Sequence, residues 1–253
     1  MKGCFYNSDN KKIPSSFAGY HIYQRSIDKS LIFRNSYDAI VLLSILSIKA
    51  KKFGVKIFAL CFMKNHIHIF VKSRHIDIIS SFVQEYSSTF SIIYNKEYER
   101  SGSLFSKSYG RAFKYTDKYV RNCISYICNN PVEAKMCRNL EEYVWNFIAF
   151  YKSRYPFSKP LVLAKSRNCL RKTEKQVKDI YTSDNYLTYP LLKSLFSSVN
   201  REEALQLKDF IINTYNPLDY EAIVSLFGNI DQAVLAMNSY TGSEHDIKED
   251  DHR

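Results

Sequence analysis

The strongest fold signal lies in residues 55–73, which read VKIFALCFMKNHIHIFVKS. Two runs rich in β-branched and aromatic residues, 55–63 and 66–73, flank a tight connection and so predict a β-hairpin. Successive side chains of a strand point to opposite faces, so His66 and His68 share one face while Ile67 and Ile69 share the other. The isoleucine face is expected to pack on the core. The histidine face is expected to meet either solvent or a second polar cluster.

The neighbouring segments extend this hairpin into an α+β pattern. The expected elements, in chain order, are a strand at 19–27, a helix at 36–53, the hairpin, a helix at 76–98, a loop and strand within 100–115, and a helix at 116–131. The last helix is expected to stop before Pro131, because the residue before a proline disfavours helical dihedrals. The order β-α-β-β-α-β-α predicts an α+β fold of the ferredoxin-like kind, an antiparallel sheet with helices packed on it.

Charge divides the chain into two parts. Residues 1–158 contain 24 Lys or Arg and 11 Asp or Glu, a balance of +13, whereas residues 159–253 contain 12 and 14, a balance of −2. The basic part favours a polyanionic partner such as nucleic acid, although a merely basic surface explains the charge equally well. The expected organisation is a flexible N-terminus (1–16), the main domain (17–153), a linker (154–170), a C-terminal helical extension (171–240) and a disordered tail (241–253).

Cysteine spacing and hydropathy restrict the class of protein. The six cysteines form no CxxC pair and no zinc-finger spacing, so reduced thiols are favoured over a metal cluster in the cysteine-rich segment 123–137. No segment approaches the roughly 18 apolar residues of a membrane span, and residues 1–16 lack the apolar region of a secretory signal. A cytoplasmic protein without a membrane partner is therefore expected.

Two side-chain pairs offer metal and nucleophile chemistry. His66 and His68 lie one pleat apart and can reach one cation, although two half-exposed strand histidines would look the same in the sequence. Tyr126 and Asn130 are four residues apart and share a helix face. A His-His-amide set suits Mg²⁺ or Mn²⁺, and a phenol beside it can attack a phosphate. Tyr119 lies only about 20° from Tyr126 around the helix, so spacing leaves both tyrosines open.

Five segments resemble the IS200-like transposases, the single-tyrosine HUH nucleases, and most closely the branch of REP-associated tyrosine transposases. The segment FMKNHIHIFVKS is similar to the hydrophobe-Met-Pro-Asn-His-x-His signature of that family. The other four follow the family in order and spacing: GYHIYQRSIDKSLIF (19–33), YNKEYERSGSLFSKSY (94–109), YVRNCISYICNNPVEAKM (119–136) and YVWNFIAFY (143–151). The resemblance covers about residues 17–151.

This resemblance implies a fold, an activity and a site. The core would be ferredoxin-like, and the activity would be cleavage and rejoining of single-stranded DNA, usually beside a foldback hairpin. His66 and His68 fall on the metal pair, Tyr126 on the nucleophile that forms a 5′-phosphotyrosine, and Asn130 on a position that completes the metal site. Family members outside the branch form dimers with shared active sites, whereas the resemblance to this branch implies monomers, so a homodimer and a monomer are both expected states.

Basic residues and two departures from the family complete the prediction. The residues expected to bind the nucleic-acid backbone are Arg25, Lys64, Lys72, Arg74, Arg111 and Arg121, of which Arg25 and Arg111 match basic family positions. Lys64 stands in place of the usual proline, which loosens the turn and adds a cation beside the metal site. Residues 159–253 do not align with the family core.

Three other functions fit parts of the sequence. A transposase-derived protein that only binds hairpins would share the fold, but the histidines and the tyrosine are retained here. A metal-dependent hydrolase with water as nucleophile would need a carboxylate near the histidines, for which Asp77 and Glu85 are the nearest candidates in the chain. Transcriptional repression could rest on the C-terminal helices, although their acidic balance argues against a DNA-reading face.

Overall fold

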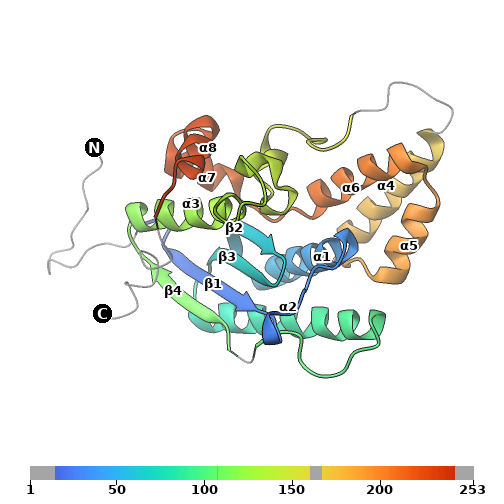
Figure 1. The fold of residues 1–253 in the computed structure, drawn as a ribbon, viewed down its shortest axis with the longest axis horizontal. Coiled ribbons are helices and arrows are strands. Elements are labelled where there is room, and N and C mark those ends of the chain that lie inside the picture. Colours follow the sequence, from blue (N-terminus) through green and yellow to red (C-terminus); the bar gives the residue numbers. More distant parts are fainter. Residues whose placement is uncertain (1–14, 107, 160–166, 243–253) are drawn as a thin grey trace, which may run out of the picture.

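The sheet has four antiparallel strands in the order β2-β3-β1-β4 (Figure 1). The computed structural model describes residues 15–242 apart from 107 and 160–166. The strands are β1 (Gly19–Arg25), β2 (Lys56–Met63), β3 (His66–Lys72) and β4 (Gly110–Lys114). The hairpin of β2 and β3 turns at Lys64 and Asn65, which confirms the predicted tight connection. The predicted α+β class with an antiparallel sheet is confirmed.

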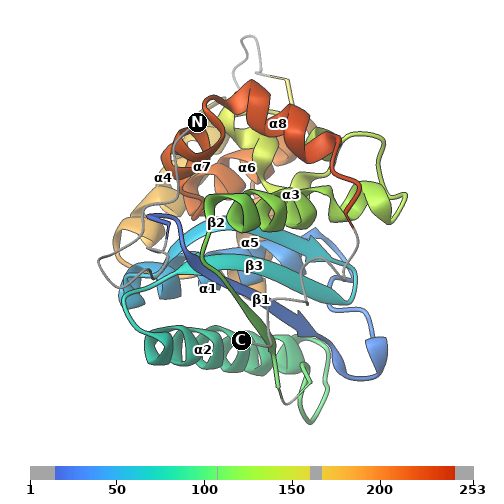
Figure 2. The same cartoon turned by 90° about the vertical axis from the view of Figure 1, so that its left-hand side faces the viewer.

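Eight α-helices lie within the described residues and cover both faces of the sheet (Figures 1 and 2). They are α1 (Ser36–Phe53), α2 (Ile76–Glu97), α3 (Asp117–Glu133), α4 (Arg167–Thr182), α5 (Tyr189–Ser197), α6 (Arg201–Tyr215), α7 (Tyr220–Phe227) and α8 (Ile230–Asn238). Helices α1 and α2 cover the isoleucine face, and α3 covers the histidine face, with α7 and α8 beyond it. The histidine face is therefore inside the protein, in contact with a helix that carries its own polar residues.

Helix α1 begins and ends where the sequence provides caps. The Asn35 side chain accepts from the Tyr37 backbone N–H, and Asp38 completes a capping box at the N-terminus. Gly54 ends the helix with φ 62°, a left-handed conformation that glycine adopts without a steric penalty. Most of α1 is buried because the sheet and α2 pack on one side of it and α5 and α6 on the other. Its all-round apolar sequence reflects this central position.

The sequence predicted that the last helix of the N-terminal part stops before Pro131. This prediction is wrong, because helix α3 continues to Glu133. Proline removes one backbone hydrogen bond from a helix, at a cost of about 3 kcal/mol in an interior position. Here the helix closes beyond the proline through bonds from Ala134 N to Asn130 O and from Met136 N to Pro131 O. Pro131 is itself buried, so packing offsets the lost hydrogen bond.

The C-terminal helices continue the hydrophobic core of the N-terminal part. Asp219 N donates to Ile57 O, and Leu218 bridges to Ile57, so residues after α6 cover the outer edge of β2. Helix α4 begins at Arg167, inside the range predicted as a linker. The predictions for residues 1–14, 160–166 and 243–253 lie outside the described residues. Among the described helices, none is long and apolar enough to cross a membrane.

Candidate active site

His66 and His68 lie on the face of β3 that α3 covers. In the sheet register His68 stands between Tyr23 of β1 and Cys61 of β2, and His66 stands between Arg25 and Met63. His68 is only 2% exposed, whereas His66, at the end of the strand, is half-buried. The two rings are 5.0 Å apart between centroids and nearly perpendicular. The strand thus brings the two imidazoles together as its two-residue period predicts.

A third histidine, which sequence reasoning did not select, completes the cluster. His21 lies on β1, and a hydrogen bond of 2.9 Å joins its Nε2 to Nδ1 of His68. The two rings are also stacked, with centroids 5.1 Å apart and planes 15° apart. A partner on Nδ1 fixes the tautomer and the orientation of a histidine whose other nitrogen binds a metal.

The turn before β3 orients the other histidine. Asn65 Oδ1 lies 2.7 Å from His66 Nδ1, and the Asn65 amide nitrogen donates to Lys29 O at 3.3 Å. The backbone of the same turn accepts hydrogen bonds from Ser26 N at Asn65 and from Ile32 N at Lys64. The turn, which contains Lys64, is therefore held by hydrogen bonds from the segment after β1.

The structure places Tyr126, and not Tyr119, over the histidines. The Tyr126 ring is edge-on to His68 at 5.5 Å and to His21 at 6.1 Å, and it is 6% exposed. The ring of Tyr119 instead contacts Tyr115 at 5.8 Å. Tyr240, after α8, lies 6.5 Å from the Tyr126 ring, and its backbone carbonyl accepts from Asn129.

Asn130 lies one turn beyond Tyr126 and is half-buried. Because residues four apart share a helix face, its carboxamide belongs to the same side of α3 as the Tyr126 phenol. The neighbouring Asn129 is buried, and its side chain donates to Tyr240 O at 3.0 Å.

Burial keeps His21 and His68 neutral. Desolvation, with a smaller contribution from the nearby Lys114 charge, lowers the pKa of His21 to about 3. Desolvation also lowers the pKa of His68 well below its ordinary value, with His21, His66 and Arg25 acting in the same direction. Neutral imidazole is the form that binds metal ions.

The donor set fits a hard divalent cation with few protein ligands. Among the described residues no group of three or more His, Cys, Asp or Glu is arranged to hold a metal ion. The Asn130 carboxamide supplies an oxygen of the kind that Mg²⁺ and Mn²⁺ accept. Both histidines have Nδ1 engaged by a protein group, as metal-binding histidines usually do.

The predicted DNA-binding residues do not form one patch. Arg25 lies opposite His66, and Lys64 is in the adjacent turn, so both belong to the site. Lys72 and Arg74 are at or beyond the other end of β3, about 20 Å along the strand from His66. Arg111 pairs with Ile22 and lies on the opposite face of the sheet. Arg121 precedes Tyr126 by five residues, which turns it about 140° around α3.

The three cysteines of segment 123–137 form no disulfide in the described part of the chain. Cys123 and Cys128 are buried and free, and Cys137 is free and half-buried. Burial raises the pKa of the Cys128 thiol to about 12, so this thiol remains protonated at neutral pH. The reduced state of these thiols stays a prediction.

Comparison with known proteins finds a family similar to the N-terminal part. Residues 15–130 match the family described as transposase, IS200-like. This range contains His66, His68, Tyr126 and Asn130 and excludes α4 to α8. A solved structure of a REP-associated tyrosine transposase bound to a REP hairpin is similar, with 12% identity, a TM-score of 0.45, and coverage of 61% of this chain and 93% of that chain. No curated protein matches the chain.

Proposed function

We propose that the N-terminal part is a transposase domain that cleaves and rejoins single-stranded DNA through a 5′-phosphotyrosine on Tyr126, beside a foldback hairpin. The observation that carries the proposal is the buried contact of the Tyr126 ring with His68 and His21, which brings a phenol to the histidine pair. The family match supports a transposase, and the motif resemblance supports this chemistry and the hairpin partner.

The proposed reaction conserves the number of phosphodiester bonds. Tyr126 Oη attacks the phosphorus, the new Oη–P bond forms as the P–O3′ bond breaks, and the phenolic proton ends on the released 3′ oxygen. Attack by a 3′-hydroxyl on the phosphotyrosine reverses these changes and joins DNA. The covalent intermediate conserves the energy of the phosphodiester bond, so the cycle needs no nucleoside triphosphate. Consistent with this, the sequence has no P-loop motif.

The surrounding residues have separate tasks. His66, His68 and Asn130 would hold Mg²⁺ or Mn²⁺, which when bound withdraws negative charge from the scissile phosphate. His21 and Asn65 orient the two histidines through their Nδ1 atoms. Arg25 and Lys64, at the same end of the sheet, provide positive charge for the DNA backbone.

The hydrolase alternative lacks its carboxylate base at this site. Asp77 and Glu85 both belong to α2, which covers the opposite face of the sheet. Glu85 is paired with Lys49 and Lys52, and these lysines lower the pKa of its carboxyl. Neither residue therefore serves the histidine cluster.

Replacing His68 with Ala tests the metal site. In Mn²⁺, the variant is expected to form the covalent protein–DNA adduct at least about 100-fold more slowly, because the metal contributes several kcal/mol of charge stabilisation. The adduct is measured on a denaturing gel with labelled hairpin oligonucleotides, and DNA binding is measured separately. His75→Ala is the matched control, because His75 is exposed and lies before α2. Unchanged adduct formation by His68→Ala would rule out the metal role.

Replacing His21 with Phe tests the orienting contact. Phenylalanine retains the stacked ring but removes the 2.9 Å hydrogen bond to His68. Loss of such a partner typically lowers metal affinity 10- to 100-fold, so Mn²⁺ binding is expected to weaken by about that factor. Electron paramagnetic resonance of free Mn²⁺ measures the affinity without DNA. An affinity equal to that of the unsubstituted protein would show that the hydrogen bond has no such role.

A further inference from the structure

Strand β4 carries a regular series of aromatic and basic side chains that the proposed reaction does not use. Tyr109, Arg111, Phe113 and Tyr115 occur at every second residue; within β4 this spacing puts Arg111 and Phe113 on one face, and Tyr109 and Tyr115 flank the strand. The register pairs Arg111 with Ile22 and Phe113 with Tyr20, which places these side chains on the face opposite the histidines. We call these four residues the β4 track.

The track is open to solvent although it is aromatic. Phe113 is 40% exposed, and Arg111 is exposed. The ring of Phe113 lies 4.8 Å from that of Tyr20 and 6.5 Å from that of Tyr115, the latter at an interplanar angle of 22°. Strand β4 is an edge of the sheet, and no described strand pairs with its outer side. The rings thus form a partly exposed ladder on an unpaired edge.

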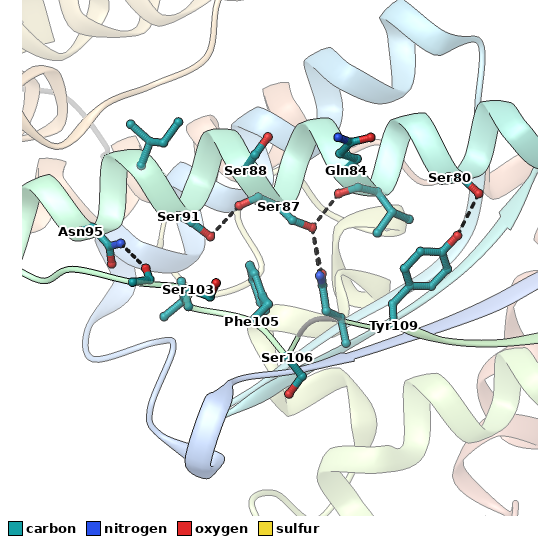
Figure 3. Close-up of a pocket in the computed structure, with 15 residues that line it drawn as sticks. Ser80, Gln84, Ser87, Ser88, Ser91, Asn95, Ser103, Phe105, Ser106 and Tyr109 are labelled. Atoms are coloured by element: carbon teal, nitrogen blue, oxygen red, sulfur yellow. Dashed lines mark hydrogen bonds between the residues drawn. The ribbon is translucent and has the colours of Figure 1, made fainter.

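A pocket adjoins one end of this track (Figure 3). It has a volume of about 790 Å³ between α2 and residues 102–106 and 109, and Tyr109 belongs to both the pocket and the track. Ser80 of α2 bonds to the Tyr109 hydroxyl at 3.1 Å, and Ser87 contacts the Gln24 carboxamide. None of its described lining residues is charged; hydroxyls, carboxamides and Phe105 predominate. Such a lining suits a neutral ring that carries hydrogen-bonding groups.

The pocket and the histidine site lie at the same end of the sheet. Ser106 N donates to Arg25 O, and Phe105 bridges to Ser26, so the pocket wall continues directly from the end of β1. Arg25 itself faces the histidines, whereas its neighbour Gln24 faces the pocket. A nucleic-acid strand held at Arg25 can therefore pass around the edge at residues 104–106 and reach the pocket and the track.

We propose that the β4 track and its pocket bind a stretch of single-stranded DNA away from the reacting phosphate. Bases stack on Phe113 and Tyr20, Arg111 meets the phosphates, and an unpaired base occupies the pocket. Side chains two residues apart are about 7 Å apart along a strand, which lets successive bases of an extended strand meet successive positions. The choice of DNA rests on the proposed function and on the +13 balance of residues 1–158.

The test compares the DNA affinities of two variants, each of which replaces one exposed apolar side chain with alanine. The probe is a fluorescein-labelled oligothymidylate, titrated by anisotropy in EDTA so that no chemistry occurs. Phe113→Ala is expected to raise the dissociation constant about five-fold or more, because stacking on one aromatic ring contributes about 1–3 kcal/mol per base. Phe113→Tyr is expected to retain affinity. Leu235→Ala is the control, because Leu235 is 70% exposed on α8 and should leave the affinity unchanged.

A second variant separates charge from stacking. Arg111→Gln is expected to reduce the slope of log K against log salt by about 0.7, the contribution of one phosphate contact on a single strand. An affinity of Phe113→Ala equal to that of Leu235→Ala, with an unchanged salt slope in Arg111→Gln, would overturn the proposal. So would light scattering that shows a dimer which Phe113→Ala dissociates without loss of DNA affinity, because the edge would then join two copies of the chain.

These results do not depend on the chemistry at Tyr126. If no covalent adduct forms in Mn²⁺ but Phe113→Ala weakens DNA binding, the proposed function is wrong and DNA binding by the β4 track is supported. If the adduct forms but Phe113→Ala binds DNA as well as the unsubstituted protein, only the proposal for the β4 track is wrong.

Discussion

Tyr126→Phe is expected to abolish covalent attachment to DNA, with a loss of about 10⁴-fold or more in the rate of strand cleavage. Removal of a catalytic nucleophile typically has an effect of this size. Phenylalanine retains the ring that contacts His68 and His21 and removes only the hydroxyl. The measurement is a denaturing gel of labelled single-stranded hairpin oligonucleotides after incubation in Mn²⁺.

The control for this variant is Tyr119→Phe. Tyr119 lies seven residues earlier on the same helix, but its ring contacts Tyr115 and not the histidines, so this variant is expected to form the adduct normally. Both variants should bind DNA with the affinity of the unsubstituted protein. An adduct that persists in Tyr126→Phe would disprove the assignment of the nucleophile.

Asp38→Ala is expected to lower the free energy of unfolding by about 3–5 kcal/mol. The Asp38 carboxylate is fully buried and accepts four hydrogen bonds. Tyr98 and Tyr189 each donate a hydroxyl at 2.7 Å, and the backbone N–H groups of Arg34 and Asn35 donate at 2.7 and 2.9 Å. The substitution leaves these donors unpaired and removes part of the α1 cap. Urea unfolding, followed by circular dichroism, measures the change.

Two further variants show whether this cluster joins α5 to the core. Tyr189→Phe removes one donor from α5 and should cost about 1 kcal/mol in a single unfolding transition. Lys51→Ala is the control, because Lys51, in the last turn of α1, makes an exposed ion pair with Asp184 and should change stability by less than about 1 kcal/mol. Separate transitions for the two parts of the chain, with Tyr189→Phe affecting only one, would contradict a shared core.

Local patterns predicted most of the sheet and its helices. The bounds of α1 match the expected 36–53, and the β2–β3 turn lies where the sequence predicts it. These elements have strong apolar periods and clear caps, so neighbouring residues determine them. The predicted end of α3 before Pro131 was wrong. The free-energy cost of the proline in the helix is offset by its burial and by the hydrogen bonds that close the helix beyond it. Such compensation depends on tertiary packing, which a single segment does not reveal.

Only part of the candidate site could be predicted from the sequence, because some of its contacts depend on how the strands pair. His66 and His68 share a strand, so their common face follows from the period of the strand. His21 belongs to another strand, and its contact with His68 depends on the register between β1 and β3. The segment GYHIYQRSIDKSLIF (19–33) resembled the family, but the resemblance gave no role to His21. The position of Arg111 on the opposite face likewise depends on the pairing of β4 with β1.

The most direct test of the central claim is the location of the DNA-linked residue. The unsubstituted protein is incubated with a single-stranded hairpin oligonucleotide in Mn²⁺, digested with nuclease and trypsin, and sequenced by mass spectrometry. Trypsin cleaves after Arg121 and so separates Tyr119 from Tyr126. The phosphonucleotide is predicted on Tyr126, in the peptide 122–135. Cleaved DNA without any linked peptide, or a nucleotide on Tyr119, would contradict the account.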